Sequence, residues 1–236
     1  MQVQLADNAE FSYRIERSAK RRTVSIQIDA GEVIVRAPKN ADELWISGWV
    51  HSKADWIYPR LCRQRDHLDA HRINLNSGHI RLFGEEYRLE HSAKVLTPVE
   101  RIDQRRKIVW VGGRDSFADA ERLELRLKRL LREAAKPLLT GMTLDIANQI
   151  GLVPKSVNVR HYKRKWGQCS SAKEVTLNWR ILHLPSTIQA YVIVHELCHL
   201  QQMNHSARFW ALVERYCPDY RASREQLKHY GAFLLW

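Results

Sequence analysis

The amino-acid sequence predicts an α+β fold, with a β-rich N-terminal part followed by a part in which helices and strands alternate. Three observations support this prediction. Up to about residue 112, short segments alternate apolar and polar side chains between turn residues, as half-buried strands do. After about residue 116, leucines recur at helical spacing over long stretches. The 236 residues include 44% hydrophobic side chains and 8 Trp, enough to form a globular core.

The N-terminal region, residues 1–112, is expected to contain short strands and one long helix. The strand-like segments are FSYRIER, TVSIQIDA, EVIVRAP, HIRLFG, EEYRLEHS and KIVWVGG. Asn40 and Glu43 are spaced as a capping box for a helix that continues to about Leu68. That helix has an apolar stripe typical of a core-facing surface, made of Trp45, Ile46, Trp49, Val50, Ile57 and Leu61. Gly112-Gly113 marks the expected boundary, and we find no internal repeat.

The C-terminal region, residues 113–236, is expected to begin with a helix from about Ser116 to Ile150, which Pro137 kinks or divides. Two strands should follow, SVNVRHYK and VTLNWRILHL, with the loop KWGQCSSAKE between them. Further helices are predicted at about 187–203, after Ser206, and from about Tyr220 to the last residue.

Composition indicates the environment and the partners of the chain. The net charge of +12 and the pI near 9.8 predict attraction to polyanions, including a weak association with nucleic acid. No segment approaches the roughly 18 apolar residues of a membrane span, and the first residues lack the apolar core of a signal peptide. Four scattered cysteines favour a reduced, cytoplasmic setting. The oligomeric state is not determined by these features.

The most informative motif is His195-Glu196-Leu197-Cys198-His199, an H-E-x-x-H signature near the middle of the helix predicted at 187–203. Two histidines four residues apart lie on the same face of a helix, so their imidazoles can hold one Zn²⁺. Glu196 can then act as the general base on a water that the metal activates. Cys198 is expected to pack inside the protein.

His205 is the expected third ligand. Asn204 suits a helix end and Ser206 suits the N-cap of the next helix, so His205 falls in a turn that can bring it back to the metal. Glu214 and Glu225 are the alternative carboxylate ligands. The histidine spacing equals that of metzincins, but Gln202 replaces their glycine and no methionine follows His205, which argues against that group.

Three neutral imidazoles leave one bound zinc per chain with its full charge and an open fourth position. The polarised substrate atom is either a peptide carbonyl or a phosphoryl oxygen. Candidates for binding the substrate or its developing charge are Arg164, Lys165 and Trp166, with His161 nearby. Asn178 lines the cleft if the strand VTLNWRILHL pairs with an extended peptide; the equally weighted alternative is that this strand lies inside a sheet.

The chain resembles the YgjP-like metallopeptidase family, which is distantly related to SprT-like and other zincin metalloproteases. The resemblance extends from about residue 12 to 230 and is carried by RRTVSIQID, VIVRAPK, KWGQCSS, LNWR, VIVHELCHLQQMNHSARFW and PDY. Gln168 departs from the serine usual in the family. The resemblance implies a zincin-like catalytic region, zinc held by His195, His199 and His205, and Glu196 as base.

Three functions are therefore compared. The motif and the possible substrate strand favour a zinc-dependent metallopeptidase. The same site with its basic surroundings is compatible with a metal-dependent nucleotide phosphohydrolase, that is, a nucleoside triphosphate pyrophosphatase. A non-catalytic nucleic-acid-binding zinc protein is the third alternative, and Glu196 argues against it because a structural zinc site needs no base.

Overall fold

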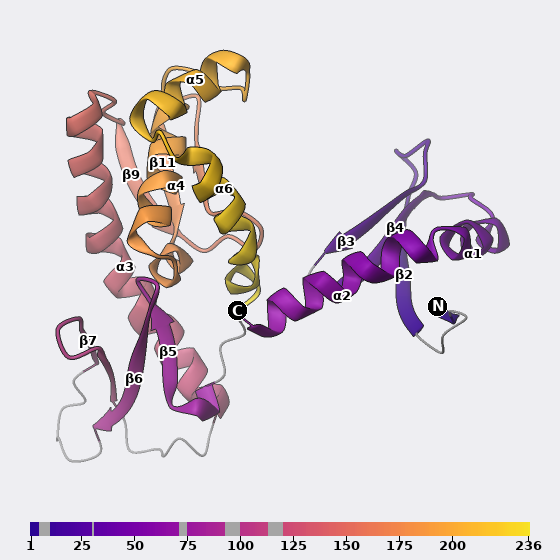
Figure 1. The fold of residues 1–236 in the computed structure, drawn as a ribbon, viewed down its shortest axis with the longest axis horizontal. Helices are drawn as coiled ribbons and strands as arrows, with labels where there is room; N and C mark the ends of the chain where they lie inside the picture. Colours follow the sequence, from indigo (N-terminus) through magenta and orange to yellow (C-terminus); the bar gives the residue numbers. More distant parts are fainter. Residues whose placement is uncertain (5–9, 30, 71–74, 93–99, 113–119) are drawn as a thin grey trace. The chain divides into compact units, whose positions relative to one another are not determined.

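A computed structural model describes residues 1–4, 10–29, 31–70, 75–92, 100–112 and 120–236 (Figure 1). The chain packs as two compact units, Met1–Arg72 and Ile73–Trp236, and each is described by itself. Helices and sheets occur in both units, which confirms the predicted α+β class. Within the described residues, no helix combines the length and the apolar character needed to cross a membrane.

The first unit is a four-stranded sheet with two helices. Its strands are β1 (Gln2–Gln4), β2 (Glu10–Ser18), β3 (Ser25–Asp29) and β4 (Glu32–Pro38), and its helices are α1 (Glu43–Ser52) and α2 (Ala54–Ala70). The strand order is β1-β2-β4-β3, with β2 and β4 parallel and the outer pairs antiparallel. Buried side chains of β2 and β4 pack against Ile46, Val50, Ile57 and Leu61 of the helices, as the apolar stripe predicts.

The single helix predicted from Asn40 to Leu68 is wrong, because the chain forms two helices separated at Lys53. The Ser52 hydroxyl donates to the carbonyl of Trp49, and the Lys53 N–H to that of Val50, which closes the end of α1. The N-cap is Asp42 and not Asn40: its carboxylate accepts from the Trp45 N–H at 2.7 Å. Trp45 itself is exposed and stacks on Trp49.

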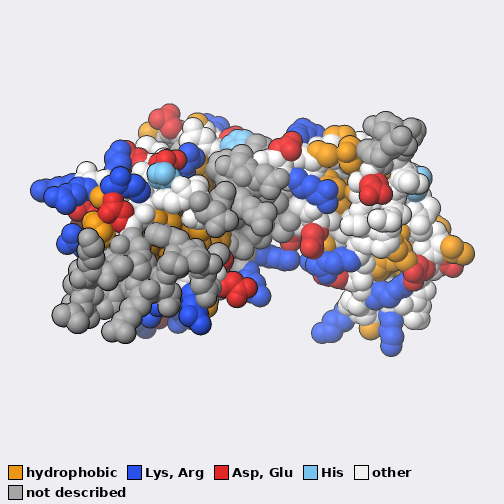
Figure 2. Space-filling model, turned by 90° about the horizontal axis from the view of Figure 1, so that it is seen from below, with side chains coloured by type: hydrophobic (Ala, Val, Ile, Leu, Met, Phe, Trp, Pro, Cys, Tyr) orange, Lys and Arg blue, Asp and Glu red, His pale blue; other side chains and the backbone are white. Residues whose placement is uncertain are grey.

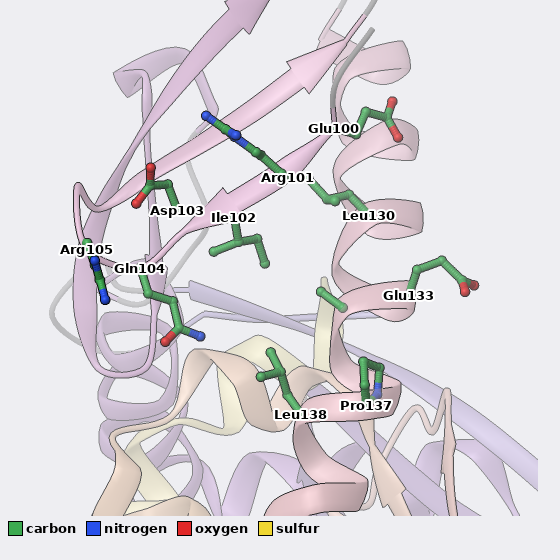
Figure 3. Close-up of a pocket in the computed structure, with 11 residues that line it drawn as sticks. Glu100, Arg101, Ile102, Asp103, Gln104, Arg105, Leu130, Glu133, Pro137 and Leu138 are labelled. Atoms are coloured by element: carbon green, nitrogen blue, oxygen red, sulfur yellow. The ribbon is translucent and has the colours of Figure 1, made fainter. Parts of the chain in front are cut away.

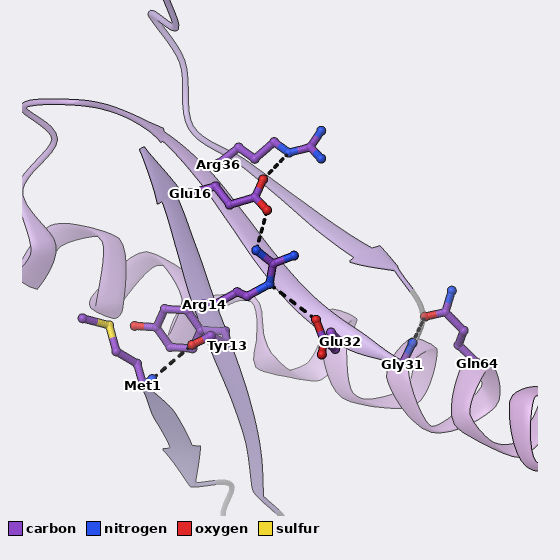
Figure 4. Close-up of polar contacts among 8 residues, drawn as sticks. All are labelled: Met1, Tyr13, Arg14, Glu16, Gly31, Glu32, Arg36 and Gln64. Carbon is purple, nitrogen blue, oxygen red and sulfur yellow. Dashed lines mark hydrogen bonds and ion pairs between the residues drawn. The ribbon is translucent and has the colours of Figure 1, made fainter. Parts of the chain in front are cut away.

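Polar contacts connect the open face of this sheet. Arg14 bonds to both Glu16 and Glu32, and Glu16 also accepts from Arg36 at 3.0 Å (Figure 4). The Gln64 side chain of α2 accepts from the Gly31 N–H at 3.0 Å, which fixes the β3–β4 turn to the helix. Because the ion pairs are solvent-exposed, they contribute little stability individually.

The second unit begins with another four-stranded sheet, and its topology repeats that of the first. Its strands are β5 (His79–Leu82), β6 (Glu85–Ser92), β7 (Arg101–Asp103) and β8 (Ile108–Gly112), preceded by the short 3₁₀ helix η1 (Leu75–Ser77). The order is β5-β6-β8-β7, with β6 and β8 parallel and the outer pairs antiparallel. The sequence also repeats, as YRIERSAK from Tyr13 and YRLEHSAK from Tyr87, so the expected absence of an internal repeat is wrong.

This second sheet shares one core with the C-terminal helices. Tyr87, Leu89 and Val109 belong to the same buried cluster as Leu127 and Leu131. The boundary between compact units therefore lies at Arg72–Ile73, and the expected division at 112 falls inside the second unit. Gly113 lies outside the described residues, and a separate catalytic region from 113 onward stays a prediction.

A long helix, α3 (Ala120–Ile150), leads to a third sheet made of β9 (Ser156–Arg160), β10 (Gly167–Cys169) and β11 (Glu174–Asn178). The helix continues through Pro137 and is not divided there. The order β10-β11-β9 makes β11 the central strand, parallel to β9 and antiparallel to β10. The predicted strand VTLNWRILHL is thus only half strand, and its second half is the 3₁₀ helix η2 (Trp179–His183).

The chain ends in helices that lie together beside this sheet (Figure 1). They are α4 (Ser186–Cys198), α5 (Ala207–Tyr216), α6 (Tyr220–His229) and the 3₁₀ helix η3 (Gly231–Leu235). The single helix predicted after Tyr220 is therefore interrupted at Tyr230. Lys and Arg side chains are spread over the visible face of the molecule, with Asp and Glu between them (Figure 2).

Candidate metal centre

The H-E-x-x-H motif lies at the C-terminal end of α4. The helix ends at Cys198 and His199 is its cap, whereas the sequence predicted a helix continuing to 203. The chain leaves the helix through tight turns, in which the Leu200 and Gln201 N–H groups donate to the carbonyls three residues earlier. At its other end, the N-cap of α4 is Pro185, and the Gln189 amide donates to the carbonyl of Leu184 at 2.8 Å.

The turn after α4 brings a third histidine to the other two. His205 directly precedes Ser206, the N-cap of α5, as the sequence predicted. The Nε2 atoms of His205 and His195 lie 3.1 Å apart. One ring nitrogen from each of His195, His199 and His205 lies within 4.8 Å of the others. In the part of the chain that is described, no other group of at least three His, Cys, Asp or Glu residues meets this criterion.

The separation and chemistry of these nitrogens fit zinc. Tetrahedral bonds of about 2.0–2.1 Å place two ligand nitrogens roughly 3.3 Å apart. The 3.1 Å between His195 and His205 is close to that value, and the 4.8 Å limit leaves only small side-chain movements. His199 bonds through Nδ1 to the carbonyl of Gln202 at 2.9 Å, which directs the lone pair of Nε2 outward. Three such nitrogens form a donor set suited to Zn²⁺.

Aromatic rings of α5 hold the three imidazoles in place. Phe209 contacts all of them, with ring centroids 4.9 Å from His195, 4.5 Å from His199 and 4.8 Å from His205. Trp210 stacks on His205. Burial, followed by the neighbouring histidines, lowers the pKa of His195 to about 3. The ring is therefore neutral at physiological pH, the form that a metal requires.

Glu196 is buried beside this cluster, with 7% of its surface exposed. Burial raises the pKa of Glu196 to about 7, and the Lys165 charge and the Cys169 N–H oppose that rise by favouring the carboxylate. A carboxyl group with a pKa near 7 can both accept and release a proton at neutral pH.

Strand β10 lies against Glu196 and has no room for a side chain at Gly167. A Cβ atom added to Gly167 would lie 2.7 Å from Cγ and 2.8 Å from Oε1 of Glu196. The glycine thus lets the backbone approach the carboxylate closely. Two residues later, the Cys169 N–H stabilises that carboxylate. Edge strand β10 therefore helps to position the predicted base.

The predicted substrate residues lie in or near the loop before β10. Lys165 is exposed, bonds to Gln168 at 3.1 Å, and is near enough to Glu196 for its charge to favour the carboxylate. Arg164 is also exposed. Trp166 is half-buried against the core, and its carbonyl accepts from the Asn178 N–H at 2.7 Å. Substrate contacts of Arg164, Lys165 and Trp166 stay predictions.

Asn178 is fully buried in the central strand, so the structure places it among the loop's supports. Its side-chain amide donates to the carbonyls of Tyr162 at 2.9 Å and Lys165 at 2.8 Å. Strand β11 has a neighbouring strand on each side, so it is an internal strand of the sheet, which was the second of the two predicted alternatives. The predicted substrate contact of Asn178 stays a prediction, and the free edge next to α4 belongs to β10.

The alternative ligands are engaged elsewhere. Glu214 pairs with Arg221 at 2.6 Å, and Glu225 pairs with Lys228 at 2.7 Å. Cys198 is fully buried in the core, and burial raises the pKa of its thiol to about 12, which disfavours the thiolate that zinc binds. His195, His199 and His205 therefore stay the predicted ligand set.

A cavity of about 760 Å³ lies elsewhere in the second unit (Figure 3). It is bounded by residues of β7, the β7–β8 turn and α3, including Arg101, Asp103, Arg105, Glu133 and Leu138. None of the three histidines lines it. The candidate site for hydrolysis is therefore the cluster of three histidines and not this cavity.

Sequence reasoning misses three supports of the site. It predicts a loop at Gly167 and Cys169, although an isolated glycine in a strand is a signal for close backbone approach. The role of Phe209 depends on the angle between α4 and α5, which local periodicity does not encode. The Gln202 carbonyl acts through its backbone, so its side chain gives no signal.

The chain is similar to a known protein family and, over part of its length, to solved structures. The family model described as "YgjP-like, metallopeptidase domain" matches residues 22–230. No curated protein matches the chain. Among solved structures, the metallopeptidase zymogen of Pyrococcus abyssi abylysin is 23% identical, with a TM-score of 0.35, covering 38% of this chain and 90% of that one. The zymogen of Methanocaldococcus jannaschii jannalysin is 19% identical, with a TM-score of 0.33, covering 38% and 96%.

Proposed function

The chain belongs to the YgjP-like metallopeptidase family, and we propose that it hydrolyses peptide bonds with one zinc ion per chain. His195, His199 and His205 hold the metal, and Glu196 is the general base. The observation that supports this most strongly is the convergence of three imidazole nitrogens within 4.8 Å beside a buried carboxylate.

When bound, zinc supplies a Lewis acid that polarises the substrate carbonyl and increases the acidity of a water molecule. Glu196 removes a proton from that water as its oxygen attacks the carbonyl carbon, and later donates the proton to the departing amine. Burial raises the pKa of Glu196 to about 7 without the metal, and a bound cation shifts that pKa downward, toward the carboxylate form that accepts the proton. The Cys169 N–H and the close contact with Gly167 keep the carboxylate in one orientation.

The free edge of β10 offers a place for the peptide. An extended chain that pairs with a sheet edge gains main-chain hydrogen bonds, and β10 is an edge strand whose Gly167 contacts Glu196. Lys165 and Arg164, in the loop before this strand, can bind a negative group of the substrate.

Hydrolysis of nucleotides is the second candidate function, and a group of cations around Arg180 favours it. The zinc-loaded protein should therefore be incubated in parallel with an unfolded protein and with nucleoside triphosphates. The Glu196→Gln variant and a chelated sample serve as controls. Peptide cleavage that both controls abolish supports the peptidase; turnover confined to the nucleotides supports the second candidate. Cleavage that persists at the same rate in Glu196→Gln contradicts the role of Glu196 in either reaction.

A further inference from the structure

We propose that the 3₁₀ helix η2 and its surroundings form a binding site for a small oxyanion, a phosphate or carboxylate group, separate from the three histidines. Its centre is Arg180, which is only 3% exposed. No carboxylate pairs with Arg180 in the described part of the chain. A guanidinium is charged at every physiological pH, so its burial without a counter-ion is unfavourable and points to a ligand that supplies the negative charge.

Buried donors on η2 lack protein partners. The Nε atom of Arg180 and the Nε1 atom of Trp179 are buried, and neither finds an acceptor among the described residues. Both groups can only donate hydrogen bonds, so the matching ligand must accept them. Burying a donor without an acceptor is costly, so the Nε atom of Arg180 favours a ligand that accepts from it.

More positive charge surrounds this point. The guanidinium of Arg132, on α3, lies 5.6 Å from the centroid of the Trp179 ring, and that of Arg180 lies 4.6 Å from it. The pKa of His161 is lowered first by partial desolvation on the side that faces the protein, and then by the charges of Arg180, Arg132, Lys163 and Lys128. Lys128 is paired with Glu124. The described residues provide no such carboxylate for Arg132, Lys163 or Arg180, and this excess charge favours a doubly charged phosphate over a carboxylate.

His161 completes the set. Its Nδ1 atom accepts from Nη1 of Arg180 at 2.7 Å, so the neutral ring carries its proton on Nε2. Since His161 is exposed, it marks the side from which solvent reaches the buried guanidinium. A phosphate there would meet the planar fork of Arg180, a geometry that recognises oxyanions well.

Arg180 and His161 both lie just beyond the ends of strands in the third sheet. Asn178 and Arg160 are register partners in the parallel strands β11 and β9, so η2 and His161 both follow the sheet at one edge. Gly167, which contacts Glu196, begins β10 opposite Leu177 at the same edge. An anion bound by Arg180 would therefore lie on the side of the sheet that leads to the base, although its binding does not depend on the proposed function.

Calorimetric titration of the zinc-loaded full chain with inorganic phosphate tests this proposal, with acetate as a parallel titrant at constant ionic strength. We expect His195→Ala to bind phosphate as the wild type does, because the metal is not involved. Arg132→Gln removes an exposed charge and should weaken binding about tenfold. The matched control is Arg106→Gln, which removes the same charge from the exposed β7–β8 turn and should leave binding unchanged.

Tighter binding of phosphate than of acetate would identify the phosphate group as the ligand, and the reverse order would identify a carboxylate. The proposal is overturned if neither anion binds the wild type, if binding disappears in His195→Ala, or if Arg106→Gln weakens it as much as Arg132→Gln. Arg180→Lys keeps the charge and removes the fork, and it should also bind less tightly. Should Arg180→Lys fail to fold, Arg132→Gln and Lys163→Gln decide the question.

Discussion

Replacing Gly167 by alanine should disable the protein through a single added methyl group. The new Cβ would lie 2.7 Å from Cγ, 2.8 Å from Oε1 and 2.9 Å from Cδ of Glu196. Unbonded carbon atoms normally lie about 3.5–4.0 Å apart, so the carboxylate must retreat by about 1 Å. Gly167 is not among the glycines with positive φ, which means that alanine adds no backbone strain and acts only through this contact.

A misplacement of about 1 Å in a catalytic group can cost on the order of 10²-fold in rate. We therefore expect kcat for peptide cleavage to fall by about that factor, while the zinc content stays at one per chain. Overpacking should also lower the free energy of unfolding, by about 1–3 kcal/mol.

Gly141→Ala is the matched control for this change. Gly141 lies in α3, and a Cβ atom added there would meet no neighbouring atom within 4 Å. Alanine at this position should therefore leave kcat unchanged and add up to about 1 kcal/mol of stability. A Gly167→Ala protein with wild-type kcat would refute the reasoning. A loss of zinc in that variant would equally show that β10 supports the metal rather than the base.

Three further predictions concern other residues. His205→Ala should bind zinc less tightly in metal titrations, and unchanged affinity would remove His205 from the ligand set. Lys165→Gln should raise KM for an anionic substrate about tenfold at constant zinc content and Tm; unaltered kinetics would exclude Lys165 from substrate binding. The third concerns acid stability, because burial lowers the pKa of His183 to about 4. The neutral, buried His183 ring contributes fully to the free energy of unfolding above pH 6.5, and this contribution is lost as the pH falls toward 4. The loss is on the order of 3 kcal/mol. Urea unfolding at several pH values should show this loss in the wild type and a flatter profile in His183→Gln.

The convergence of the three histidines could be predicted from the sequence because its information is local. His195 and His199 are one helical turn apart, and His205 follows between a helix end and the N-cap Ser206, so short-range rules suffice to bring them together. The end of α4 at Cys198 was not predicted, since apolar periodicity continues through Leu200 and does not register the tight turns that follow.

Features that depend on distant segments were not predictable in this way. Strand β10 is short and polar, and it forms because β11 and α4 lie beside it. Gly84 has a positive φ, and a Cβ there would lie 2.8 Å from Pro185, which shows how closely the second sheet approaches the start of α4. That contact lies within the second unit, Ile73–Trp236, whereas local composition suggested a boundary near Gly112.

The repeated sheet is easier to recognise from its strand order than from the alternation of apolar and polar residues. The segments beginning at Tyr13 and Tyr87 each form the second strand of a sheet with the same order and directions. The β7 strand is shorter than β3, so the second copy is harder to detect by alternation alone.

X-ray absorption at the zinc edge of the metal-loaded protein tests the central claim most directly, because it reports which atoms bind the ion. The account predicts three imidazole nitrogens at about 2.0–2.1 Å and one further oxygen, with no sulfur. Replacing His205 by alanine should reduce the imidazole contribution from three to two. A sulfur ligand at about 2.3 Å, or an imidazole count unaffected by that substitution, would contradict the proposed metal centre.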